Sequence, residues 1–105
     1  MKSIDLSPQE LQVVQHILRE QVPEYQVRAF GSRVSGSARK TSDLDLALMT
    51  DERLPTMRMV DLKDAFIECD LPFKVDIVDW AVARAPFREI IERQYVVVQR
   101  AVNEG

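Results

Sequence analysis

The sequence is poor in the residues that build disulfide and zinc frameworks. It has one cysteine, Cys69, and one histidine, His16. A single cysteine cannot form an internal disulfide, and one residue of each kind is too few for the usual structural zinc sites. A cytoplasmic location is therefore the default expectation.

Long apolar runs and an excess of positive charge are also missing. No apolar run approaches the roughly 20 residues that a membrane-spanning helix needs, and the N-terminus has no apolar signal core. The formal net charge is −3, which disfavours general binding to nucleic acid. We therefore expect no membrane association. The negative charge of any phosphate-bearing ligand has to be neutralised by local side chains and backbone groups or by metal ions.

The remaining composition is typical of a small globular protein. Hydrophobic residues make up 46% of the chain and charged residues 30%, which are ordinary values. A chain of 105 residues is long enough for one hydrophobic core. We expect a single domain over residues 1–105.

Three segments have the apolar spacing of amphipathic helices. The first covers about 7–23, where Ser7 can cap the helix and Glu10 can complete a capping box. The second covers about 56–70, and the third begins near Pro86. The apolar residues expected to face the core are Leu11, Val14, Leu18 and Val22 in the first helix, Met59, Leu62, Phe66 and Cys69 in the second, and Phe87, Ile90, Ile91, Tyr95 and Val98 in the third.

Three other segments have the alternation of strands: 25–30, 43–49 and 74–80. A short helix over 33–38 is expected between the first two strands. The valine run 96–98 leaves a strand as the alternative to the end of the last helix, because β-branched residues favour strands. The order of elements predicts a small α/β (α+β) fold with helices packed on a mixed sheet of three or four strands.

Two carboxylates lie one residue apart in the second predicted strand. Side chains alternate across a strand, so Asp43 and Asp45 share one face while the intervening leucines share the other. Their Cα atoms are then roughly 7 Å apart, a spacing that suits two hard cations about 3.5–4 Å apart. Asp76 needs only an adjacent strand to join them. Each aspartate alone could instead cap a turn or face solvent.

A small-residue turn, Gly31-Ser32, precedes this strand. Glycine allows close approach of a ligand to the backbone, and the serine adds a hydroxyl and an amide donor. Arg33 and Arg39 follow, and either could contact phosphate or form a structural ion pair. Ser42 is expected to support the turn before the strand.

These residues together resemble the signature of a known superfamily. Gly31-Ser32, ten intervening residues and Asp43-Leu44-Asp45 resemble the motif of the DNA polymerase β-like nucleotidyltransferases, and of their minimal, stand-alone MNT-type branch in particular. The strand that carries Asp76 lies where that family has its third carboxylate. The resemblance implies a nucleotidyltransferase fold.

The resemblance also implies roles for the residues. Gly31, Ser32 and Arg33 would bind the nucleotide, and the catalytic aspartates, Asp43, Asp45 and Asp76, would bind two Mg²⁺ ions. MNT-type proteins resemble antitoxins paired with a HEPN-domain toxin, to which they transfer AMP from ATP, on a tyrosine hydroxyl. This chain is then expected to be a protein adenylyltransferase that acts as an antitoxin. Two alternatives stay open: a non-catalytic antitoxin that only binds its partner, and nucleotidyl transfer to a small molecule, which would need a site shared across an oligomer.

Overall fold

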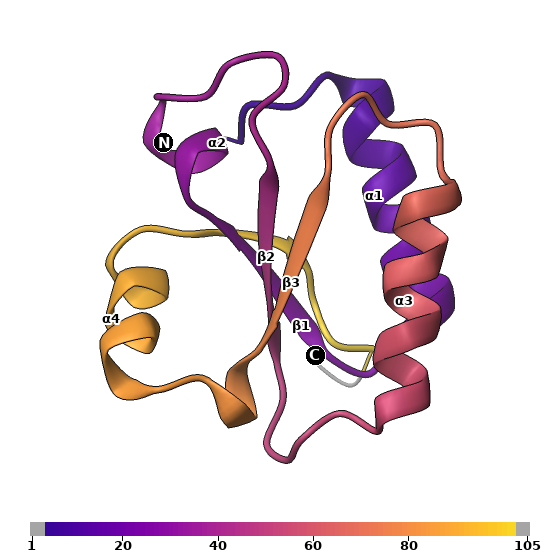
Figure 1. Cartoon of the computed structure of the whole chain (residues 1–105), viewed down its shortest axis with the longest axis vertical. Coiled ribbons are helices and arrows are strands. Elements are labelled where there is room, and N and C mark those ends of the chain that lie inside the picture. The colour runs from indigo at the N-terminus through magenta and orange to yellow at the C-terminus, as the bar shows by residue number, and fades with distance from the viewer. Residues whose placement is uncertain (1–3, 103–105) are drawn as a thin grey trace.

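The computed structural model describes residues 4–102, and Figure 1 shows their arrangement. The elements in chain order are α1 (Pro8–Gln21), β1 (Gln26–Phe30), α2 (Ser32–Ser35), β2 (Leu44–Met49), α3 (Thr56–Glu68), β3 (Val75–Asp79), the 3-10 turn η1 (Trp80–Val82), α4 (Ala85–Arg93) and β4 (Val96–Gln99). Helices α1 and α3 lie on one side of the sheet and α4 lies on the other, while the short α2 follows the end of β1 (Figure 1).

The four strands form one mixed sheet in the order β3-β2-β1-β4. Strand β1 pairs antiparallel with β2 and with β4, and β2 pairs parallel with β3. The predicted mixed α/β sheet is therefore confirmed, with the larger of the two expected strand numbers. Strands β3 and β4 are its two edges.

The main core lies between the sheet and helices α1 and α3. The leucines of β2 (Leu44, Leu46 and Leu48) are almost fully buried there, as the alternation predicts. The helices contribute their predicted stripes, including Val14 and Leu18 from α1. This packing fixes which face of β2 is left for the aspartates.

A smaller core covers part of the opposite face. Its buried members are Phe30, Ala47 and Ile91, packed against partly buried neighbours such as Val78 and Trp80. Helix α4 supplies Ile91, so it covers only the part of this face near the ends of β2 and β3. The other part, near the starts of those strands, belongs to the acidic residues.

The end of the chain differs from the prediction of one long helix. Helix α4 ends at Arg93, and residues 96–99 form β4 along the edge of β1. Three consecutive valines favour this extended state, and Val98 joins the main core from the sheet rather than from a helix. Phe87 and Ile90, which were expected to face the core, are 42% and 55% exposed.

The helix boundaries follow local chemistry. The capping box of α1 is formed, with Ser7 N–H donating to Glu10 Oε1 at 2.9 Å and Glu10 N–H donating to Ser7 Oγ at 3.1 Å. Helix α2 is shorter than predicted because Gly36 adopts a left-handed conformation (φ +90°) that ends it.

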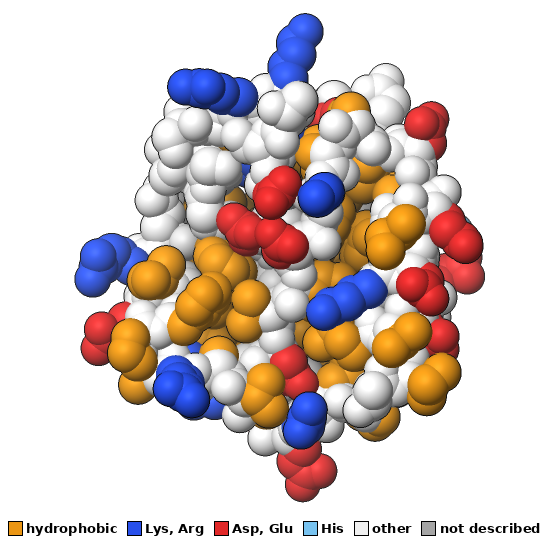
Figure 2. Space-filling model, viewed as in Figure 1, with side chains coloured by type: hydrophobic (Ala, Val, Ile, Leu, Met, Phe, Trp, Pro, Cys, Tyr) orange, Lys and Arg blue, Asp and Glu red, His pale blue; other side chains and the backbone are white. Residues whose placement is uncertain are grey.

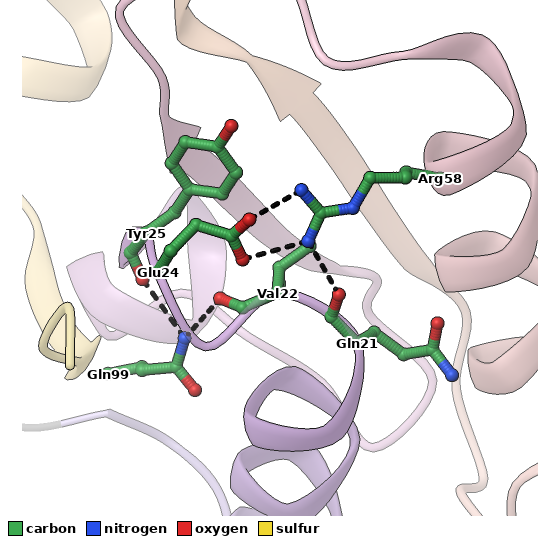
Figure 3. Close-up of polar contacts among 6 residues, drawn as sticks. All are labelled: Gln21, Val22, Glu24, Tyr25, Arg58 and Gln99. Carbon is green, nitrogen blue, oxygen red and sulfur yellow. Dashed lines mark hydrogen bonds and ion pairs between the residues drawn. The ribbon is translucent and has the colours of Figure 1, made fainter.

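A polar network at the end of α1 ties three elements together (Figure 3). Arg58 of α3 forms an ion pair with Glu24 (2.5 Å) and donates to the Gln21 carbonyl (2.9 Å). Gln99 of β4 donates through Nε2 to the carbonyls of Val22 (2.9 Å) and Tyr25 (3.0 Å). These contacts fix the turn between α1 and β1 far from the acidic face.

No helix within residues 4–102 is long and apolar enough to cross a membrane.

Candidate active site

Strands β2 and β3 bring the acidic residues together. Asp45 and Asp76 are partners in the parallel register of the two strands. Register partners of adjacent strands project to the same face of a sheet. Asp43 lies just before β2, where the Leu44 N–H donates to the Lys74 carbonyl at 2.9 Å and so continues the pairing of the two segments.

The acidic residues are accessible from solvent. Asp43 and Asp76 are exposed, and Asp45 is half-buried. In Figure 2, acidic side chains gather at the centre of the molecule above β2 and β3, next to an apolar area over α4. The aspartate face thus opens outward while the leucine face is in the core, which is the arrangement that the alternation of β2 predicts.

The electrostatics of Asp45 reflect this grouping. Burial raises the pKa of Asp45 above its usual value of 3.8, and the negative charges of Asp76 and Asp43 raise it further. Like charges disfavour the ionised form of a neighbouring carboxyl. Positive charge placed beside Asp45 would therefore be stabilised by its own carboxylate and by the two neighbouring ones.

Gly31 lies directly against Asp45. Strands β1 and β2 pair Phe30 with Asp45, so the residue after Phe30 meets the same carboxylate. A Cβ atom built on Gly31 would lie 2.2 Å from Asp45 Oδ2, and Gly31 has φ +79°. Only glycine satisfies both conditions at this position. The predicted turn and the predicted carboxylate pair thus form one site.

Ser32 begins α2 immediately after this glycine. The Gly31 carbonyl accepts hydrogen bonds from the N–H groups of Val34 and Ser35, both at 3.0 Å, which closes the turn. Ser32 is half-buried beside it. The turn therefore holds Ser32 next to Gly31 and near the acidic group.

Arg33 is placed differently from the two roles that its sequence position suggested. Its side chain is buried (5% exposed), and its guanidinium donates to backbone carbonyls rather than extending over the acidic face. The acceptors are Ser42 O, Asp5 O, Lys40 O and Arg39 O. With its donors used in this way, Arg33 holds the loop before Asp43 instead of contacting phosphate. Ser42 supports the same loop, as expected, through its Oγ, which accepts from Arg39 N–H at 2.8 Å.

The chain matches a family model described as polymerase beta, nucleotidyltransferase, over residues 12–102. The chain belongs to this nucleotidyltransferase family. Its fold is therefore that of a nucleotidyltransferase, the fold that the resemblance of the glycine-serine turn and the aspartate pair implied.

Relatives of this nucleotidyltransferase include a protein of Haemophilus influenzae described as probable protein adenylyltransferase MntA. The two are 51% identical over 96 residues, which are 91% of this chain and 84% of the relative. A crystal structure described as a toxin-antitoxin with AMP-PNP has a TM-score of 0.73 at 22% identity, with 88% of this chain and 74% of the other covered.

A second similar structure comes from Shewanella oneidensis. It is described as a tri-AMPylated HEPN toxin in complex with MNT antitoxin, and it has a TM-score of 0.64 at 21% identity, with 86% and 69% of the two chains covered. At these identities the two structures show a shared fold.

The donor chemistry of the candidate site suits Mg²⁺. All three acids offer carboxylate oxygens, and Mg²⁺ is usually bound by one or two carboxylates together with water and substrate phosphates. Among residues 4–102, no three acidic, histidine or cysteine side chains are close enough to form a ready ligand cluster. The carboxylates thus fit the part of a Mg²⁺ coordination shell that protein usually supplies.

One structural residue of the site region was only partly foreseen. Asp79 at the end of β3 was expected to be structural and to cap the following segment, and its side chain does accept from Ala81 N–H at 3.2 Å. It is also buried (7% exposed) and accepts from Thr50 Oγ1 and from Leu54 N–H. These partners lie 29 and 25 residues away in the chain, and no local sequence pattern points to them.

Proposed function

We propose that this nucleotidyltransferase is a Mg²⁺-dependent protein adenylyltransferase. It would transfer AMP from ATP to a hydroxyl, specifically a tyrosine, of a partner HEPN-type toxin and so act as its antitoxin, in the cytoplasm where ATP is available. The observation that carries the reaction type is the contact between Gly31 and the Asp45 carboxylate, in register with Asp76. A protein acceptor is carried over from the relative described as a probable protein adenylyltransferase, and a HEPN toxin from the complex of Shewanella oneidensis. The tyrosine is what the resemblance to MNT-type proteins implies.

Each residue of the site has a role in this proposal. The turn at Gly31 and Ser32 would receive the triphosphate, because Ser32 offers a hydroxyl and an amide N–H that can donate to phosphate oxygens. Asp43, Asp45 and Asp76 would hold Mg²⁺, which when bound supplies positive charge for the phosphate oxygens. The protein has a net charge of −3, so its overall charge does not stabilise the negative phosphate oxygens.

Asp76 is the residue that we assign to the acceptor hydroxyl. It is exposed and lies on β3, an edge strand, so an incoming side chain can reach it. The acceptor oxygen would bond to the α-phosphorus, pyrophosphate would leave, and the hydroxyl proton would pass to the Asp76 carboxylate.

The test is transfer of label from α-labelled ATP to the protein encoded by the neighbouring gene. We expect Mg²⁺-dependent label on a tyrosine with the wild-type chain, and none with the double variant Asp43→Ala/Asp45→Ala. An unlabelled partner with the wild-type chain would contradict the proposal. If the double variant still neutralised the partner, the non-catalytic binding role would replace it; label on a small molecule alone would point to the other alternative.

A further inference from the structure

The buried guanidinium of Arg33 connects segments that are separate in the sequence. Nε donates to Ser42 O at 2.9 Å, and Nη2 donates to Lys40 O at 3.0 Å and to Arg39 O at 3.3 Å. Three backbone carbonyls in the four residues before Asp43 are thus bound by one side chain. The residue that carries this side chain directly follows Ser32.

The same guanidinium reaches the segment before β3 and the segment before α1. Its Cζ atom lies 4.0 Å from the centre of the Phe73 ring, and Phe73 is three residues before Asp76. Nη1 donates to Asp5 O at 2.8 Å, while Asp5 N–H donates back to Arg33 O at 2.7 Å. Arg33 therefore contacts the chain next to the glycine-serine turn, before Asp43 and before Asp76.

We infer that Arg33 is a positioning residue for the metal-binding carboxylates. The inference rests on the proposed function, because it assumes that Asp43, Asp45 and Asp76 act together on Mg²⁺. Strand pairing fixes Asp45, but Asp43 lies outside β2 and depends on the loop that Arg33 holds. Stacking on Phe73 aligns the start of β3 with that loop. Arg33 thus sets the separation of Asp43 from the other two acids without touching the substrate.

The arrangement requires arginine rather than any cation. Four carbonyl acceptors and one aromatic face are met at once by a planar guanidinium with donors in a fixed fork. A lysine ammonium is a compact point charge and cannot serve acceptors on both sides of the loop while stacking on a ring. Arg33→Lys should therefore keep the positive charge but lose the alignment of the loop before Asp43 with the start of β3.

The experiment measures binding of Mn²⁺, as a probe for Mg²⁺, by electron paramagnetic resonance of the free ion in the presence of a non-hydrolysable ATP analogue. We expect Arg33→Lys to weaken Mn²⁺ binding about 10–100-fold, the range seen when residues that orient metal ligands are changed. Circular dichroism at the same temperature establishes that the variant is folded. The transfer reaction should show the same shift in the Mg²⁺ concentration that it requires.

Arg58→Lys is the matched control. Arg58 also donates to a backbone carbonyl and joins distant segments, but it does so at the α1–β1 turn away from the acidic face (Figure 3). We expect Arg58→Lys to lower the melting temperature without changing Mn²⁺ binding. If Arg33 had a purely structural role, both variants would have a lower melting temperature and unchanged Mn²⁺ binding.

A folded Arg33→Lys variant that binds Mn²⁺ like the wild type would overturn the inference. If Arg33→Lys does not fold, Phe73→Leu takes its place, because it removes the stacked ring and leaves the hydrogen bonds. Weaker Mn²⁺ binding by a folded Phe73→Leu variant supports the inference, and unchanged binding contradicts it. A wild-type chain that binds no Mn²⁺ would instead overturn the proposed function, and the role of Arg33 with it.

Discussion

At the scale of the residue, the absence of a side chain at Gly31 matters as much as the carboxylates themselves. We predict that Gly31→Ala destabilises the protein by about 1–3 kcal/mol, the range for backbone strain, and lowers transfer activity about 100-fold, because it displaces a reacting group by an ångström or more. The new Cβ would lie 2.2 Å from Asp45 Oδ2. Chemical unfolding and the labelling assay measure the two effects.

Gly36→Ala is the control for the strain alone. Gly36 has φ +90°, but a Cβ built there meets nothing within 4 Å. We expect a stability loss of about 1–2 kcal/mol from the left-handed backbone and unchanged transfer by the folded protein. Equal activity losses in the two variants would mean that the close contact with Asp45 is not the cause.

At the scale of the element, β3 has two faces with different tasks. Asp76 is exposed on one face, while Asp79 on the other is buried and accepts hydrogen bonds from Thr50, Leu54 and Ala81. We predict that Asp79→Ala costs about 2–6 kcal/mol, because two buried donors lose their acceptor at about 1–3 kcal/mol each. For a domain of this size that lowers the melting temperature by about 8 °C or more.

Asp76→Ala tests the other face of the same strand. Since Asp76 is exposed, its removal should leave the melting temperature of the metal-free protein unchanged or slightly raised, while transfer activity is lost. Calorimetry of both variants separates the two faces. A large loss of stability from Asp76→Ala would contradict this division.

The elements also indicate why some of the fold could be predicted and some could not. The alternation in β2 predicts its buried and open faces because both depend on residues within one strand. Strand β4 is harder to predict, because its valines also fit the apolar stripe of a helix. The choice between strand and helix depends on the free edge of β1, about 70 residues earlier in the chain. The same distance effect conceals the carbonyl partners of Arg33, whose position beside Ser32 suggested a phosphate contact instead.

At the scale of the whole molecule, the acidic site should oppose stability when no metal is present. The folded-state pKa of Asp45 is raised, so this group stabilises the fold below its unfolded value of 3.8, and that contribution is lost as the pH rises through the folded pKa. We predict that Asp45→Asn raises the melting temperature of the metal-free protein at pH 7 by a few degrees, where about 4–8 °C corresponds to 1 kcal/mol.

Melting curves as a function of pH, with and without Mg²⁺ and ATP, check this prediction. The difference between wild type and variant should vanish below about pH 3.8, where the wild-type carboxyl is protonated in both states. With Mg²⁺ and ATP the order should reverse, because only the wild type gains the stabilisation of a bound ligand. A variant that is less stable than the wild type at pH 7 without metal would contradict the charge argument.

Helix α4 covers only part of its face of the sheet, and this has a consequence for how reactions are controlled. A reacting centre that is open over a wide angle admits the surface of another macromolecule without any movement of a lid. It also leaves water free to compete for the same phosphorus atom. Under the proposed transfer to a protein, the docked acceptor would have to exclude water, and the enzyme without its partner would hydrolyse some ATP unproductively.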